Sequence, residues 1–233
     1  MDGGTAKTGN TWYEVGVNTA APTSGIRTGL VSGQADSLSS YLIQPSDARN
    51  TLMLDGATKS GSLNFRSPLT ISAFSIVGSS GNGAGSVVPT LHFADTTTAV
   101  LTSGVVGDWF NNTPIVETAA GRIDIVANTF NNVAAANPRI LSLSYTLTAD
   151  QASKQIASIT LDWAGGATTH TAIFGVSGDF TGLGHFSPIP LNVSSFNQDT
   201  IVGASEVIVP EPGTWALFSF GAAGLALARR RRA

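Results

Sequence analysis

Few side chains in this sequence combine the residue types and the spacing that catalysis requires. The 233 residues include no cysteine, which excludes a thiol nucleophile, a thiolate zinc cluster and a disulfide framework. The three histidines, His92, His170 and His185, have no HxH or HExxH spacing that would place two metal ligands on one face. Ser177 lies in Gly-Val-Ser-Gly-Asp, which departs from the GxSxG motif, and we expect it to end a strand at a turn. We therefore expect no metal centre and no catalytic serine.

A pair of carboxylates is the remaining route to hydrolysis, because an acid and a base several ångströms apart can come from distant parts of a chain. The best candidates are Asp95, Asp108, Glu117 and Asp162. No spacing favours one pair, so a secreted glycan hydrolase stays as the alternative to a non-enzymatic protein. Asp95, which precedes a run of threonines, is also a candidate calcium ligand, although no further oxygen ligands cluster near it in sequence.

The stretch Asp-Trp-Phe-Asn-Asn at 108–112 has the composition of a sugar-binding site. An exposed Trp109 would stack on a sugar ring, while Asp108 and Asn111 would form hydrogen bonds with its hydroxyls. The alternative is that Trp109 and Phe110 pack in the core and the asparagines shape a turn. Aromatic residues of β-sandwiches pack more often than they bind, which favours this alternative.

The composition favours a strand-rich fold and argues against nucleic acid as a partner. Only 12% of the residues are charged, and Gly, Ser, Thr, Ala and Asn are abundant, a mixture typical of turns and short strands. Arg229–Arg232 are 4 of the 12 basic residues, and without them 8 Lys and Arg face 15 Asp and Glu, a net charge of −7. An acidic body of this kind has no positive surface for a phosphate backbone.

Alternating apolar and polar residues predict a sheet protein from residue 61 onward. The pattern is clearest in 139–148, where leucines and a tyrosine alternate with serines and threonines, and it recurs in 86–95 and 154–165. Seven or eight such strands, separated by Gly, Asn and Pro, predict two packed antiparallel sheets. Pro89 lies inside one strand, which indicates an edge strand or a bulge. No stretch before the C-terminal tail keeps a helical period.

The C-terminal tail differs from the rest of the chain. No residue between Thr214 and Ala228 is charged, and these 15 residues would form a helix of about 22 Å, shorter than a hydrocarbon core of about 30 Å. The arginines that follow would stay in the cytoplasm, which orients the body outside. Pro210 and Pro212 keep the residues before them extended and accessible to a protease.

The tail resembles the PEP-CTERM sorting signal of Gram-negative bacteria. A Pro-Glu-Pro element, a short apolar helix and a basic end occur in the order of that signal. Its sorting motif would be Val209, Pro210, Glu211 and Pro212, and its basic stop Arg229, Arg230, Arg231 and Arg232. The resemblance implies export, transient retention in the inner membrane, and processing by a membrane-embedded exosortase. Such proteins begin with a secretory signal, which the first 15 residues do not contain, so we expect the true start to lie upstream.

The body resembles a recurring domain of PEP-CTERM proteins that is similar to a galactose-binding β-sandwich. The marks that carry this resemblance are Gly29-Leu30, Ser79–Gly83, His92–Thr96, Asp108–Phe110, Gly121-Arg122, Asn137–Arg139 and Ala172–Gly178. Gly29-Leu30 is followed by Val-Ser-Gly, whereas a Pro-rich sequence is more usual at this place in that domain. The resemblance implies a jelly-roll type of fold and a secreted setting, and it brings no reaction.

Together these patterns predict an all-β, two-sheet antiparallel β-sandwich followed by one transmembrane helix. The expected organisation is an N-terminal segment over 1–28, the sandwich over 29–203, a linker over 204–212, the helix over 213–228 and a basic tail over 229–233. We expect a non-enzymatic protein of the cell surface or extracellular matrix, without a resident cofactor. Its expected partners are exosortase and the membrane. The family also implies exopolysaccharide as a partner, with a binding or structural role for the protein.

Overall fold

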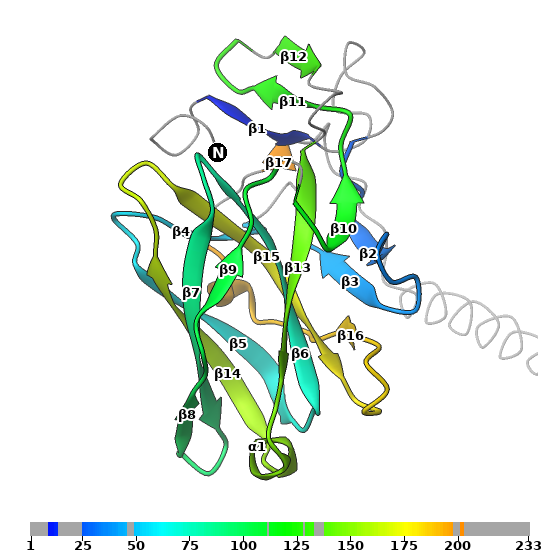
Figure 1. The fold of residues 1–233 in the computed structure, drawn as a ribbon, viewed down its shortest axis with the longest axis vertical. Coiled ribbons are helices and arrows are strands. Elements are labelled where there is room, and N and C mark those ends of the chain that lie inside the picture. Colours follow the sequence, from blue (N-terminus) through cyan, green and yellow to red (C-terminus); the bar gives the residue numbers. More distant parts are fainter. Residues whose placement is uncertain are drawn as a thin grey trace, which may run out of the picture.

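The computed structural model describes residues 9–13, 25–45, 49–110, 112–127, 129–132, 138–197 and 201–202. Within these residues the chain is almost entirely β-strand, and the helical elements are one turn-length helix, α1 (Ala149–Ser153), and a single 3-10 turn, η1 (Val193–Ser195). The strands pair antiparallel except for one short pair, as Figure 1 shows. The prediction of an all-β antiparallel protein is confirmed.

Two sheets form the centre of the molecule. The smaller sheet contains β5 (Ser60–Leu69), β14 (Ile156–Ala164), β7 (Gly85–Phe93), β8 (Thr98–Val100) and β9 (Gly104–Val106). The larger sheet contains β10 (Ile115–Thr118), β13 (Arg139–Thr146), β6 (Ala73–Gly81), β15 (His170–Asp179), β16 (Ser187–Pro188) and β4 (Leu52–Leu54). The strands β6 and β15 pair along almost their whole length at the centre of the larger sheet.

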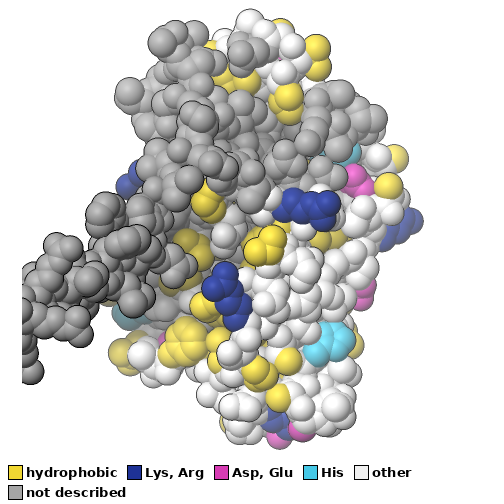
Figure 2. Space-filling view, turned by 180° about the vertical axis from the view of Figure 1, so that it is seen from behind, with side chains coloured by type: hydrophobic (Ala, Val, Ile, Leu, Met, Phe, Trp, Pro, Cys, Tyr) yellow, Lys and Arg dark blue, Asp and Glu magenta, His cyan; other side chains and the backbone are white. Residues whose placement is uncertain are grey.

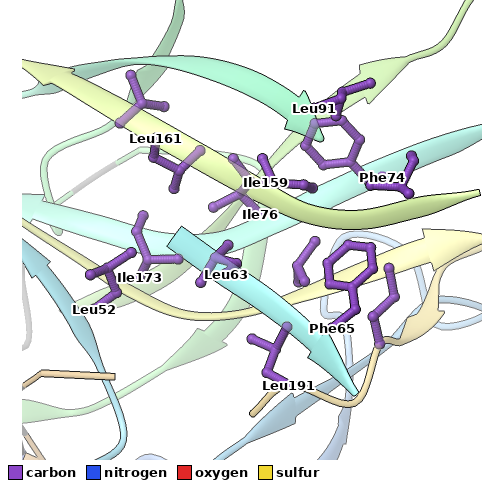
Figure 3. Packing of buried hydrophobic residues seen from close by; sticks show 14 of the residues in the cluster. Leu52, Leu63, Phe65, Phe74, Ile76, Leu91, Ile159, Leu161, Ile173 and Leu191 are labelled. Atoms are coloured by element: carbon purple, nitrogen blue, oxygen red, sulfur yellow. The ribbon is translucent and has the colours of Figure 1, made fainter. Parts of the chain in front are cut away.

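A hydrophobic core fills the space between these two sheets. In β7 the side chains alternate between buried and half-buried, as the sequence pattern predicts for a strand with one wet face. Figure 3 shows side chains of both sheets packed together, among them Leu63, Phe65, Leu91, Ile159 and Leu161 from the smaller sheet and Phe74, Ile76 and Ile173 from the larger one. Apolar burial of this kind is the main contribution to the stability of such a fold.

The larger sheet is covered on its other face as well, which a two-sheet sandwich does not predict. A four-stranded sheet of β1 (Asn10–Tyr13), β11 (Gly121–Asp124), β12 (Thr129–Asn132) and β17 (Ile201–Val202), and a hairpin of β2 (Gly29–Ser32) and β3 (Ser40–Ile43), supply additional strands. A second core containing Trp12, Tyr13, Val77, Ala172 and Phe174 results. Both β6 and β15 are therefore buried along nearly their whole length.

This second core explains why β15 lacks a clear alternation in sequence. Its residues are apolar or small at nearly every position, which is the pattern of a strand that is covered on both faces. Residues 10–13, which we expected to precede the sandwich, contribute the fully buried Trp12 and Tyr13. The folded body thus begins upstream of residue 29.

Pro89 lies in a strand that has partners on both sides. β9 pairs with residues 85–87 and β8 with residues 90–92, so the neighbouring strand is interrupted opposite Pro89. The Pro89 carbonyl accepts a hydrogen bond from Leu101 N at 2.8 Å on this side. Because the N and C=O of one strand residue point the same way, the missing amide of Pro89 faces the interruption. The expectation of an edge strand was wrong, and the irregularity lies in the partner.

No helix in the described part of the chain is long and apolar enough to cross a membrane. The transmembrane helix expected at 213–228 lies outside the described residues.

Candidate functional sites

The Asp108–Phe110 loop is fastened to the turn between β6 and β7. Asp108 Oδ2 accepts a hydrogen bond from Gly83 N at 2.8 Å, and its Oδ1 accepts one from Phe110 N at 3.0 Å. Trp109 N donates to the Ser80 carbonyl at 2.7 Å. Two of the sequence marks, Ser79–Gly83 and Asp108–Phe110, therefore contact each other, and both carboxylate oxygens of Asp108 hold backbone amides.

Trp109 is buried, with 1% of its surface exposed. Its ring centroid lies 4.7 Å from that of Trp12 in an edge-on arrangement and 5.1 Å from that of Phe110. The Arg122 guanidinium carbon lies 5.9 Å from the centroid of the Trp109 ring. The structure thus corrects the interpretation of Trp109 as an exposed platform for a sugar ring and confirms the favoured alternative, in which Trp109 packs in the core. Asn111 lies outside the described residues.

The four candidate acids lie on different elements and have different partners. Glu117, in β10, is buried, and Arg27 holds both its oxygens, with Nε at 2.8 Å from Oε1 and Nη2 at 3.0 Å from Oε2. The hydrogen bonds and the charge of Glu117 raise the pKa of Arg27. Asp162 is exposed on the outer face of β14. Among the described residues, no hydrogen bond or ion pair joins two of the four candidates.

Asp95 lies in the exposed turn between β7 and β8. Its Oδ1 accepts a hydrogen bond from Thr97 N at 2.9 Å, and hydrogen bonds from the Thr97 hydroxyl and amide lower the pKa of Asp95. The ammonium of Lys154 lies 3.9 Å from its Oδ2. Within the described ranges no three His, Asp or Glu residues gather around a point that could hold a metal ion.

The histidines and Ser177 occupy separate places. His92 Nε2 lies 2.9 Å from Thr160 Oγ1, whereas His170 Nδ1 lies 3.7 Å from Asp55 Oδ2. Ser177 is fully buried inside β15 and donates to the Ser40 carbonyl at 3.0 Å, so it joins β15 to β3. It has a structural role, but the strand continues to Asp179, and the expected turn at Ser177 was wrong.

Asp179 organises a loop that sequence reasoning missed. The Asp179 carboxylate is buried and accepts hydrogen bonds from Thr181 N at 2.9 Å, Thr181 Oγ1 at 3.0 Å, Gly182 N at 2.8 Å and Gly184 N at 2.7 Å. Burial raises the pKa of this carboxyl, but the hydrogen bonds from Gly184, Thr181 and Gly182 outweigh burial and hold the pKa well below its usual range. Gly182 and Gly184 have φ of 74° and 81°, a region that favours glycine. The run Asp-Phe-Thr-Gly-Leu-Gly at 179–184 was the available signal in the sequence.

A second loop lies against the first. Between β2 and β3, Asp36 accepts hydrogen bonds from Leu38 N at 3.0 Å and from the Ser39 hydroxyl. Phe186 N donates to Ser39 Oγ at 3.0 Å, and His185 Nδ1 lies 3.6 Å from Asp36 Oδ2. We call residues 36–39 and 180–186 together the paired-loop surface. Its exposed apolar side chains are Leu38, Phe180 and Leu183, with 68%, 50% and 72% of their surface exposed.

The Asp179→Asn variant is expected to be less stable than wild type at neutral pH by about 1–3 kcal/mol, because an amide cannot accept all four of these hydrogen bonds. The folded-state pKa lies below the unfolded value of about 3.9, so the stabilisation is present above that pH and is lost as pH falls through the folded pKa. Urea unfolding from pH 7 downward should therefore show the two proteins converging. Asp162→Asn is the control, and an equal effect of both substitutions would contradict the role of Asp179.

The described fold defines an all-β protein of β-sandwich type, and its sorting signal is identified by comparison. A family model described as the PEP-CTERM protein-sorting motif matches residues 209–232. The match contains both Val209–Pro212 and Arg229–Arg232, which lie outside the described residues, and it confirms the resemblance of the tail. The protein therefore carries a signal for exosortase sorting to the surface or exterior of a Gram-negative cell. A search of curated proteins found no match to the chain.

Proposed function

We propose that the protein is a non-enzymatic component of the extracellular polysaccharide matrix, in which its body binds the polysaccharide or has a structural role. The observation that carries this proposal is the sorting signal at 209–232, which follows a β-sandwich-like body. Residues 213–228 hold the chain transiently in the inner membrane as a transmembrane helix, with the body outside and Arg229–Arg232 in the cytoplasm. Exosortase then processes the chain near Val209–Pro212.

The outer face of the smaller sheet supports a role among polysaccharides. Ser62, Thr160 and Thr90 lie in one row across β5, β14 and β7. Ser62 Oγ lies 2.8 Å from Thr160 Oγ1, which is also 2.9 Å from His92 Nε2. Figure 2, which views the molecule from the side of β5, shows a broad region of uncharged polar side chains and backbone in white. Such a surface suits a hydrated environment rich in hydroxyl groups. The proposed fold of the body is a galactose-binding-like β-sandwich.

The direct test uses the processed protein released by its own cells. Co-sedimentation with the purified matrix polysaccharide of those cells should remove the protein from solution in a saturable manner. The control for nonspecific adhesion is the same protein, unfolded in urea and kept unfolded. Absence of binding by the native protein to its own polysaccharide would refute the proposed matrix role as a binding protein.

A further inference from the structure

We infer that the paired-loop surface is the sugar-binding site of the protein and that it takes a neutral sugar ring of the matrix polysaccharide. This inference rests on the function proposed above. It adds the location of the binding site and the charge of the ligand. Figure 2 shows hydrophobic side chains gathered at the lower left edge of the molecule, where β15 and β16 are joined. The loops that form this surface come from distant parts of the chain and contact each other through Ser39 and Phe186.

Hydrogen bonds hold both loops of this surface in place. Asp179 holds one loop by four hydrogen bonds, and Asp36 holds the other through Leu38 N and Ser39 Oγ. Ser40 N also donates to the Phe186 carbonyl at 2.8 Å, which fixes the two loops relative to each other. A fixed surface loses little conformational entropy when it binds, so exposed apolar side chains on it contribute more of their contact energy to affinity.

The apolar groups suit the C–H face of a sugar ring. Phe180 is the one aromatic residue among the large hydrophobic side chains that are exposed in the described part of the chain. Leu183 lies in the same loop, and Leu38 lies in the other. Single exposed apolar residues need no explanation, but these three lie on two loops that hydrogen bonds join. An aromatic ring with aliphatic neighbours is the usual apolar part of a small-ligand site.

The polar groups of the surface set the expected charge of the ligand. The amides of Thr181, Gly182 and Gly184 donate to Asp179, and Leu183 N donates to Thr181 Oγ1 at 3.3 Å. These four amides are thus used internally, and the half-exposed carboxylate of Asp36 is left as an acceptor for a ligand. Sugar hydroxyls are donors that fit such acceptors. Neither loop contains Lys or Arg, and the imidazole of His185 lies 3.6 Å from Asp36 Oδ2, so a uronate would meet a carboxylate without a permanent cation.

The test compares variants of the processed protein on matrix polysaccharide that anion exchange has separated into a neutral and a uronate-containing fraction. Wild type should bind the neutral fraction more tightly, and Phe180→Ala should weaken that binding by about tenfold or more. Val126→Ala is the matched control, because Val126 is 78% exposed on the turn between β11 and β12, away from both loops, and this variant should bind as wild type does. Equal melting temperatures of the three proteins verify that each is folded.

The outcomes separate this inference from the proposed function. Binding by wild type and Phe180→Ala with equal affinity would overturn the location of the site and leave the matrix role intact. Tighter binding to the uronate fraction would overturn the inference that the ligand is neutral. A loss of self-association in Phe180→Ala, measured by light scattering and without a change in glycan binding, would assign the patch to a second copy of the chain and overturn the inference. Failure of wild type to bind either fraction would refute this inference and the binding role in the proposed function.

Discussion

Replacement of Trp109 by alanine is expected to lower the free energy of unfolding by about 3–5 kcal/mol, because it removes a large buried side chain and leaves a cavity beside Trp12. The effect is a loss of core packing, so any loss of glycan binding in this variant would reflect unfolding. Urea titration followed by circular dichroism measures the change. Trp109→Phe, which keeps an aromatic ring in the second core, should lose less.

The comparison variant for Trp109 is Phe180→Ala. Phe180 is half exposed, and its removal should change the unfolding free energy by less than about 1 kcal/mol. If Trp109→Ala were as stable as Phe180→Ala, the position of Trp109 in the second core would be wrong. The pair of variants therefore separates an aromatic residue that holds the fold from one that faces the surroundings.

Replacement of Arg229–Arg232 by alanines is expected to abolish normal processing at the C-terminus. These residues end the matched sorting motif, and positive charges that stay in the cytoplasm are what fixes the orientation of such a tail. Mass spectrometry of protein from cells and from the medium measures the outcome. Released wild-type protein should lack Arg232, whereas the variant should keep its C-terminal residues or fail to reach the surface.

The control for the arginine replacement is Lys154→Ala, which removes a positive charge from the body and should leave processing unchanged. Lys154 is distant in sequence from the sorting motif and contacts Asp95 and Asp150. Released wild-type protein that still contained Arg232 would show that the tail is not removed, and the sorting interpretation of residues 209–232 would then fail.

The parts of this protein that could be predicted are those that local sequence determines. The alternation in β7 and the order of Pro-Glu-Pro, apolar segment and arginines are both linear patterns, and both interpretations were confirmed. The second core could not be predicted, because it depends on contacts between residues far apart in sequence, such as that of Trp109 with Trp12. The same holds for the paired-loop surface, since the contact between Ser39 and Phe186 exists only in the folded chain.

Local pattern also misled where the fold covers a strand twice. The sequence predicts that this strand ends in a turn at Ser177, because the glycines and serine are typical turn residues. In the structure these small residues allow close packing on both faces of the larger sheet. An added Cβ at Gly178 would lie 2.7 Å from Ile71 Cγ2, which explains the need for glycine there.

The pairing of β17 with β1 has a mechanical consequence. Ile201 and Val202 pair in parallel with Trp12 and Tyr13, and both of the latter side chains are fully buried. Any pull on the chain beyond Val202 is therefore carried first by the hydrogen bonds between these two strands, and then by the second core. A force applied at this point would reach the fully buried Trp12 and Tyr13 without first stretching a loop of the body.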